Sequence, residues 1–372
     1  MRRAILVFSV LLPAIPALAL AADWSFYGSQ RMSTFYVHED YGGTPVNGQD
    51  DDWGLDWNFQ GNSRLGAKVK AEKVSGQIEL ALRAANGGDG GDGGVNTRLA
   101  YGVWHFSDKG ALKVGKDFSP VTQPISGQVF NEDDNMEGSG VFHGRRPAGL
   151  TLIMGGFELA FLTNALNDSS SGASVTPADS DPDWNLPKIE ARYALKLDTF
   201  EFIPFGGFQY FRVSEGASTL QDDLDIYSYV LGLTGKMNLG AFSLAAVGAY
   251  GQNWSNARWK NGYNDPSSSS ASLKGGGDDV NDATSYMLGL VCGFALNPNL
   301  KFEVGLGYRN DDPDSPGSDN DDFWQGYLQA VLTLAPGVFI VPEVGYQDFM
   351  DDAAGNDEGY TWYVGAKWQI NF

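Results

Sequence analysis

The stretch YTWYVGAKWQINF, residues 360–372, alternates between two kinds of side chain. Every second residue from Tyr360 to Phe372 is apolar or aromatic, and most of the residues between them are polar or small. A period of two predicts a β-strand with one apolar face and one mostly polar face. Aromatic rings stand towards both ends of the apolar face, with Val364 and Ala366 in the middle. Because aromatic rings favour the two lipid–water interfaces, this pattern predicts a strand that crosses an outer membrane.

The first 21 residues have the pattern of a secretory signal peptide. Arg2 and Arg3 form a short basic region, residues 4–20 are mostly apolar, and residues 19–21 (ALA) fit a cleavage site between small residues. No later segment has the ~18 apolar residues that a membrane helix needs, so a membrane protein of this sequence must be a closed barrel. We therefore expect residues 1–21 to be removed and residues 22–372 to form one outer-membrane β-barrel.

The composition fits a large barrel with a wet interior. The chain has 372 residues with 48 glycines, 13% aromatic residues and a formal net charge of −21. A chain this acidic is poorly suited to binding nucleic acid, because the phosphates would repel it. Cys292 is the only cysteine, which excludes an intrachain disulfide.

Short and long connectors alternate along the whole chain, as expected for a barrel with short turns at one end and long loops at the other. The strand on residues 188–197 places Ile189 and Tyr193 on one face and Lys188 and Glu190 on the other. Such a charged face needs water, and about sixteen strands leave an aqueous lumen. The fold prediction is therefore an all-β, 16-stranded antiparallel transmembrane β-barrel. The sixteen strands are expected at residues 24–37, 53–71, 77–85, 95–106, 111–115, 143–154, 157–164, 188–197, 200–213, 224–237, 241–252, 282–296, 300–309, 322–334, 338–347 and 359–372.

A secreted β-sandwich would also produce alternating strands. Its core would hold the largest side chains in the middle of each strand. Here the aromatic residues gather at strand ends on the apolar face, as at Trp24, Phe26, Trp362 and Phe372. This placement favours the membrane barrel.

The third long connector, residues 116–142, combines apolar and acidic side chains. Its apolar residues are Phe118, Val121, Ile125, Val129, Phe130, Val141 and Phe142. Its acidic residues are Asp117, Glu132, Asp133, Asp134 and Glu137. A loop surrounded by water would not need seven apolar side chains, so we expect this third loop to fold inward against the barrel wall.

Three sequence features together resemble the trimeric general-diffusion porins of bacterial outer membranes. They are the strand LKVG at residues 112–115 before a long acidic third loop, the opening strand WSFYG at residues 24–28, and the terminal Phe372. The chain is most similar to the homotrimeric porins of sulfate-reducing and related delta-class bacteria. The resemblance implies a homotrimer in contact with lipid and lipopolysaccharide, a third loop that narrows the pore, and a second loop, residues 86–94, that contacts the neighbouring subunit.

The resemblance also implies that basic side chains on the early strands face the acids of the third loop. By the period of two, Arg31, Arg64, Arg83 and Arg98 point into the lumen. Arginine stays charged at every working pH, and opposed acids and bases create a transverse field that disfavours apolar solutes. The expected function is a water-filled channel for passive diffusion of small hydrophilic solutes and ions. The negative chain and loop acids predict weak cation selectivity. Wall charges scattered without a constriction are the simpler alternative.

Other functions have less support from the residues. A substrate-selective channel for sugars or anions is the closest alternative. An enzymatic barrel would need a histidine paired with serine or aspartate, and none of His38, His105 and His143 shows such a pairing in the sequence. We expect no cofactor. The acidic outer connectors could bind Ca²⁺ and bridge to lipopolysaccharide phosphates, although carboxylates surrounded by water are the favoured explanation. These acidic connectors include residues 50–52, 86–94, 278–279, 311–312 and 319–322.

Overall fold

The structure is a computed structural model. It describes residues 22–42, 53–83, 94–166, 175, 182–214, 220, 222–260, 263–265, 267–275 and 277–372, without the side chain of Arg83. The expected signal peptide (residues 1–21), the acidic run 50–52 and nearly all of the second loop (84–93) lie outside these residues.

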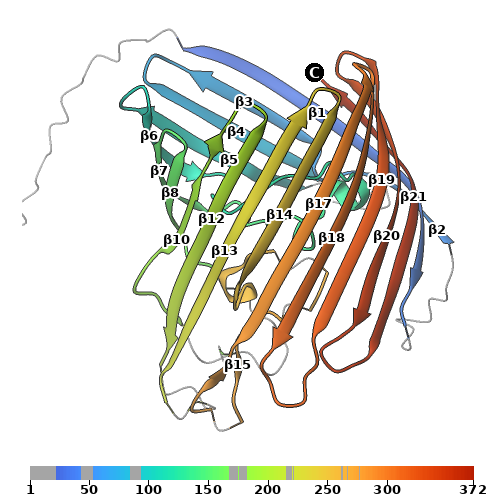
Figure 1. Ribbon diagram of the computed structural model, residues 1–372. Helices are drawn as coiled ribbons and strands as arrows, with labels where there is room; N and C mark the ends of the chain where they lie inside the picture. Colours follow the sequence, from blue (N-terminus) through green and yellow to red (C-terminus); the bar gives the residue numbers. More distant parts are fainter. Residues whose placement is uncertain are drawn as a thin grey trace, which may run out of the picture.

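The chain forms a closed barrel of sixteen antiparallel strands, as the alternating pattern predicts (Figure 1). The barrel closes where β1 (Asp23–Asp40) pairs with β21 (Asp357–Asn371), from Ser29 opposite Asn371 to Asp40 opposite Tyr360. The C-terminal stretch is therefore the closing strand. Full closure leaves no unpaired sheet edge, as a lipid environment requires.

Most strands keep the predicted positions within a few residues. Two of the sixteen are interrupted: β2 and β3 together pair with β1, and β9, β10 and β11 together pair with β12. The remaining bounds are β2 (Trp53–Phe59), β3 (Arg64–Lys70), β4 (Val74–Arg83), β5 (Gly94–His105), β6 (Gly110–Lys116), β7 (Ala148–Met154), β8 (Phe157–Leu162), β9 (Pro182–Asp183), β10 (Lys188–Tyr193), β11 (Leu195–Lys196), β12 (Phe200–Val213), β13 (Leu224–Leu239), β14 (Phe242–Gln252), β17 (Ala283–Asn297), β18 (Leu300–Pro313), β19 (Asp321–Ala335) and β20 (Val338–Asp351).

The two faces of each strand meet different surroundings. On β21, Trp362 and Trp368 are 45% and 46% exposed on the outside, whereas Tyr363 and Lys367 are buried on the inside. The apolar face of residues 360–372 therefore points outward. An outer surface of this kind is stable in lipid, because it carries apolar and aromatic side chains where a soluble barrel would carry charges.

The two ends of the barrel differ in their connections. The turns at 71–73, 106–109, 155–156, 197–199, 240–241, 298–299 and 336–337 are short and share one end with the C-terminus, the upper end in Figure 1. The longer connectors lie at the other end, where β15 (Ser272–Leu273) pairs with β16 (Val280–Asn281). The predicted alternation of connector lengths is present throughout.

Within the residues that the structure describes, helical structure is confined to short turns inside the connectors. They are α1 (Phe130–Asp133), whose backbone is left-handed at Asn131 and Glu132, and the 3₁₀ turn η2 (Ser255–Ala257). Over the described ranges, no helix is both long enough and apolar enough to cross a membrane.

Two predicted strand positions are wrong in detail. The strand expected at 143–154 begins only at Ala148, because residues 143–147 still belong to the third loop. The strand expected at 53–71 is broken at 60–63, where the backbone turns to meet the tip of the third loop. Both departures come from contacts with this loop, which the period of a strand does not encode.

Candidate functional site

The third loop, residues 117–147 between β6 and β7, crosses the interior of the barrel (Figure 1). On one side Glu343 of β20 accepts hydrogen bonds from the backbone N–H groups of Val129 and Phe130, at 2.8 and 3.0 Å. On another side Glu190 of β10 accepts one from the N–H of Val121, at 3.3 Å. These buried carboxylates satisfy loop donors that no strand partner satisfies. The loop is therefore attached to the inner wall, as its apolar residues predict.

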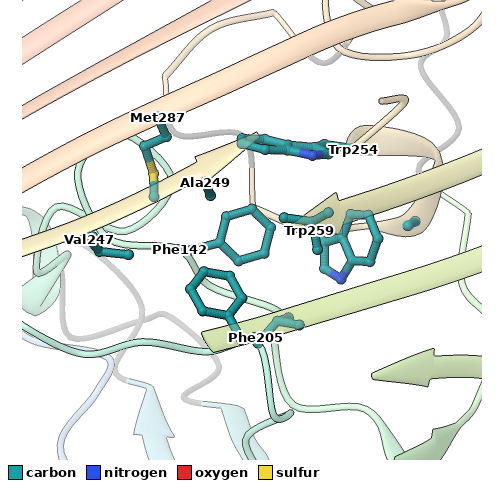
Figure 2. Packing of buried hydrophobic residues seen from close by; sticks show 10 residues of the cluster. Phe142, Phe205, Val247, Ala249, Trp254, Trp259 and Met287 are labelled. Carbon is teal, nitrogen blue, oxygen red and sulfur yellow. The ribbon is translucent and has the colours of Figure 1, made fainter. Parts of the chain in front are cut away.

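Val121 and Phe142 of the third loop pack against a second inward loop, which the residue pattern did not predict. This sixth loop, residues 253–282 between β14 and β17, contributes Trp254 and Trp259 (Figure 2). The ring of Phe142 lies 4.9 Å from Trp254 and 5.7 Å from Phe205 of β12, centroid to centroid. Two tryptophans in a connector rich in serine, asparagine and glycine were the sequence signal for this packing.

Close backbone approach also holds the third loop in place. Gly289 of β17 lies so near the loop that a Cβ atom there would stand 1.7 Å from the carbonyl oxygen of Gly140. At Gly307 of β18 the nearest atom, the carbonyl oxygen of Ser139, would be 2.5 Å away. Glycine at these two wall positions is what allows the loop to touch the strands.

The tip of the third loop presents its acids through left-handed backbone at Asn131, Glu132 and Asp133, with φ of 48°, 62° and 59°. Asp133 forms ion pairs with Arg31 of β1 and with Lys367 of β21, whose Nζ lies 2.9 Å away. Asp133 and Arg31, two of the predicted site residues, therefore meet directly.

The same tip explains the break between β2 and β3. Glu132 accepts a hydrogen bond from the N–H of Gly61 at 2.8 Å, and the side chain of Asn62 donates to Asp133 at 2.9 Å. Within the break at 60–63 the N–H of Gly61 serves the loop, whereas the N–H of Gln60 still donates to the carbonyl of Arg31 on β1.

The next two acids face the sixth loop. Asp134 forms an ion pair with Lys260 and accepts a hydrogen bond from the hydroxyl of Tyr263 at 3.0 Å. Glu137 lies 3.7 Å from Lys260 and 3.6 Å from Nε2 of His143. Burial raises the pKa of Glu137 above its ordinary value, and burial beside Arg146 lowers the pKa of His143 well below its own. His143 is therefore neutral near pH 7.

The other predicted site residues have different partners. Arg64 and Arg98 both pair with Glu79 of β4, at 3.4 and 2.9 Å, and not with the loop acids. Asp117 pairs with Lys113 at 2.6 Å, at the base of the loop. The side chain of Arg83 lies outside the described part of the chain.

An open cavity of about 990 Å³ brings most of these groups together. It lies between the inner faces of β1, β3, β4 and β5 and the third and sixth loops. Its acidic lining residues are Glu132, Asp133, Asp134 and Glu137. Its basic lining residues are Arg31, Arg64, Arg98, Lys116, Arg145, Arg146, Lys188, Arg258 and Lys260. Among the described residues, cationic side chains therefore outnumber carboxylates in this cavity.

Of the six cations beyond the predicted arginines, Lys116 and Lys188 lie in strands, and the other four come from loops that strand periodicity does not cover. Arg145 and Arg146 stand at the end of the third loop, and Arg258 and Lys260 belong to the sixth loop. Their presence in the cavity depends on how the two loops fold. A pair of adjacent arginines following an acidic loop was the visible signal in the sequence.

Neither a metal site nor a catalytic group is evident in the residues that the structure covers. They contain no group of three or more histidine, cysteine, aspartate or glutamate side chains placed to hold a metal ion. Ser75 Oγ lies 3.0 Å from Nε2 of His105, but no described carboxylate hydrogen-bonds to that histidine. The arrangement as described can orient and attract solutes by charge.

Comparison with known proteins shows similarity of structure without similarity of sequence. No protein-family model matches the sequence, and no curated protein matches it either. The outer membrane channel DcaP of Acinetobacter baumannii matches 94% of this chain and 97% of its own, with 15% identity and a TM-score of 0.72.

Two further solved structures match over nearly their full length. OmpF of Salmonella typhi, in complex with daunomycin, is 13% identical and covers 93% of this chain and 97% of its own, with a TM-score of 0.60. The anion-selective porin from Comamonas acidovorans is 15% identical and covers 94% of this chain and 100% of its own, with a TM-score of 0.57. The chain thus shares its barrel fold with these three proteins.

Proposed function

We propose that the protein is a water-filled channel through which small hydrophilic solutes and ions diffuse passively across a bacterial outer membrane. The observation that carries this proposal is an open, charged cavity inside a closed barrel whose outer surface is apolar. Side chains fill a barrel of about eight strands, whereas sixteen leave room for water. The fold shared with outer-membrane channels and porins supports the same function.

The third loop is the element that would set the width of the channel. It occupies the lumen and presents acids towards Arg31, while Arg64 and Arg98 stand on the same wall. A solute that passes the third loop exchanges part of its hydration water for contacts with charged side chains. Polar solutes can compensate for that exchange and apolar solutes cannot, which would favour hydrophilic cargo. We propose no enzymatic activity.

The charges of the cavity favour anions as the preferred ions, which differs from the weak cation selectivity expected from the sequence. The net charge of the chain includes carboxylates on the outer connectors, and salt screens such exposed charges beyond about 8 Å at physiological ionic strength. The narrow cavity, with nine basic and four acidic lining residues, acts on ions at close range. We therefore propose a channel with moderate anion preference.

We also propose that the protein assembles as a homotrimer embedded in lipid and lipopolysaccharide, with its signal peptide removed. The trimeric porins that the sequence resembles support this assembly. The predicted contact of the second loop with a neighbouring subunit falls on residues 86–94, of which 86–93 lie outside the described chain.

Release of solutes from lipid vesicles tests the channel function. Vesicles that contain the folded protein should release small uncharged sugars quickly and retain large dextrans, because the cavity admits only small molecules. Vesicles with heat-unfolded protein serve as the control. Folded, protease-resistant protein that leaves the vesicles impermeable to the small sugars would rule the proposal out.

A further inference from the structure

Three arginines that line the cavity take no part in the ion pairs that hold the third loop. Arg145 and Arg146 end the third loop, and Arg258 follows η2 in the sixth loop. All three line the 990 Å³ cavity, and Arg145 Nε donates to the backbone carbonyl of Arg258 at 3.2 Å. Two segments more than a hundred residues apart therefore bring their guanidinium groups to one place.

These arginines lack a carboxylate partner within the described chain. Asp133 pairs with Arg31 and Lys367, and Asp134 pairs with Lys260. Glu137 lies beside Lys260 and His143, and its charge acts on Arg145 and Arg146 only from beyond ion-pair distance. No ion pair of the described residues includes Arg145, Arg146 or Arg258. Concentrated positive charge without a counter-charge is costly unless water or an anion compensates it.

Arg146 also has an unused donor. Its guanidinium carbon lies 4.3 Å from the centre of the Phe118 ring, which fixes the plane of the group. Its Nε is enclosed and has no hydrogen-bond partner among the described residues. Enclosed donors normally have acceptors, so the described chain leaves the hydrogen-bonding capacity of this guanidinium incompletely satisfied.

The backbone holds two of the arginines in an uncommon conformation. Arg145 has φ of 64° and Arg258 has φ of 51°, in the left-handed region that residues with a Cβ seldom adopt. Such conformations persist where the surrounding structure enforces them, and they concentrate at functional sites. Here they place both side chains, which are exposed to the cavity, beside each other.

Electrostatics agree with this geometry. Burial, and next the charge of the neighbouring Arg98, lower the pKa of Arg146 to about 10, while the charge of Glu137 opposes the shift. Burial also lowers the pKa of Arg145, with Arg258 as the next cause. Like charges thus repel each other across the cavity, and a bound anion would relieve this repulsion.

We propose that Arg145, Arg146 and Arg258 form a binding subsite for the carboxylate or phosphate group of a small anionic solute in transit. The subsite rests on the proposed channel function and adds to it a place where the solute pauses. Guanidinium groups suit this role because their planar, forked donors match two oxygens of a carboxylate or phosphate at once.

Titration of the folded protein with citrate and, separately, with inorganic phosphate tests the subsite. Calorimetry in dilute salt should detect saturable binding of at least one of the two. Citrate alone would identify carboxylates as the ligand class, and phosphate alone would identify phosphates. In a planar bilayer the same anion should reduce the chloride current in a concentration-dependent manner.

The triple variant Arg145→Gln, Arg146→Gln and Arg258→Gln should weaken this binding at least tenfold. Lys196→Gln removes a positive charge that is 76% exposed and does not line the cavity, and should leave binding unchanged. If the triple variant does not fold, Arg258→Gln alone, on an exposed side chain of the sixth loop, should weaken binding severalfold. Absence of saturable binding, or equal binding by wild type and variants, would overturn the subsite.

The two proposals fail in different ways. Folded wild type that conducts ions but binds neither anion refutes the subsite and leaves the channel function intact. Wild type that binds an anion but neither conducts nor releases sugars refutes the channel function.

Discussion

A single carboxylate joins the third loop to the seam of the barrel. Asp133 lies between Arg31 of β1 and Lys367 of β21, the two strands that close the sheet. All three side chains are about nine-tenths buried, so the ion pairs are weakly screened by salt. Removing the carboxylate would leave two enclosed cations without their partner.

Asp133→Asn should therefore loosen the loop tip and make the cavity more positive. We expect a loss of about 1.5–3 kcal/mol of loop docking, the usual contribution of a hydrogen bond to a charged group. The reversal potential in a salt gradient should move further towards anions, and the open-channel current should become noisier. Asp198→Asn, in an exposed short turn, is the matched control and should behave as wild type. An unchanged reversal potential in Asp133→Asn would show that this carboxylate does not face the ion path.

Glu137 makes ion preference depend on pH. Its pKa is raised by burial, while Lys260 opposes the shift, and Asp134, His143 and Arg146 are its other charged or titratable neighbours. As pH falls through this raised pKa, Glu137 gains a proton and the cavity loses a negative charge. Anion preference should therefore increase as pH falls, from a higher pH than an ordinary glutamate would allow, and reversal potentials at pH 7 and pH 5 report the change.

Glu137→Gln tests whether the pH dependence of ion preference comes from this residue or from the other acids. The variant should show at pH 7 a stronger anion preference than wild type, and a smaller change between the two pH values. A variant that keeps the full pH-dependent shift would assign the effect to other groups. Reversal potentials measured at both pH values in one bilayer give the comparison.

Among the elements, the strands were predictable and the loop contacts were not. Period-two alternation depends on neighbouring residues, so it located sixteen strands and the outward face of β21. The break at 60–63 depends on a hydrogen bond to the tip of the third loop, and β7 starts late because residues 143–147 belong to that loop. Such contacts link residues about seventy positions apart, and no local pattern records them.

The sequence likewise predicted one part of the candidate site and not the other. The acids of the third loop and the lumen-facing side of Arg31 followed from composition and period. The partners of those acids, Lys260 and Lys367, and the role of Glu79 beside Arg64 needed the folded barrel. The polar composition of the sixth loop indicated an outer connector, whereas its two buried tryptophans decide where it packs.

Close contact between the third loop and the wall gives a test at the level of the element. Gly289→Ala adds a Cβ that would overlap the carbonyl oxygen of Gly140, so the loop must move away from β17. We expect faster proteolysis within residues 117–147 and a conductance that differs from wild type by about a quarter or more. Overpacking of this kind typically costs about 1–3 kcal/mol.

Gly235→Ala in β13 is the matched control. No heavy atom lies within 4 Å of a Cβ placed there, so this strand glycine can take a methyl group without a clash. Its conductance and protease resistance should equal those of wild type. Equal behaviour of the two variants would mean that the loop does not rest on β17 in the membrane.

At the scale of the whole molecule, the proposed trimer predicts behaviour in detergent. Unheated protein should migrate as an oligomer of three chains, and heating should convert it to a monomer, since barrel contacts and subunit contacts both need the folded sheet. Cross-linking followed by mass measurement checks the number of chains. A folded species that remains a single chain at all concentrations would exclude the trimer and leave the barrel unaffected.

Charge is distributed unevenly over the molecule. The chain as a whole has a net charge of −21, while its lumen cavity is lined by more basic than acidic side chains. A low-dielectric wall focuses the field of the lining charges on a passing ion. Ion preference should therefore depend on the charges of the cavity and not on the overall charge of the chain.

The most direct measurement is the current through single channels in a planar bilayer with dilute potassium chloride at unequal concentrations on its two sides. We predict stepwise openings with a steady conductance and a reversal potential of the sign that indicates chloride preference. The preference should decline as salt is raised, because the cavity charges become screened. Absence of steps from correctly folded protein would contradict the channel itself. Steps with a reversal potential that indicates potassium preference would contradict the role given to the cavity.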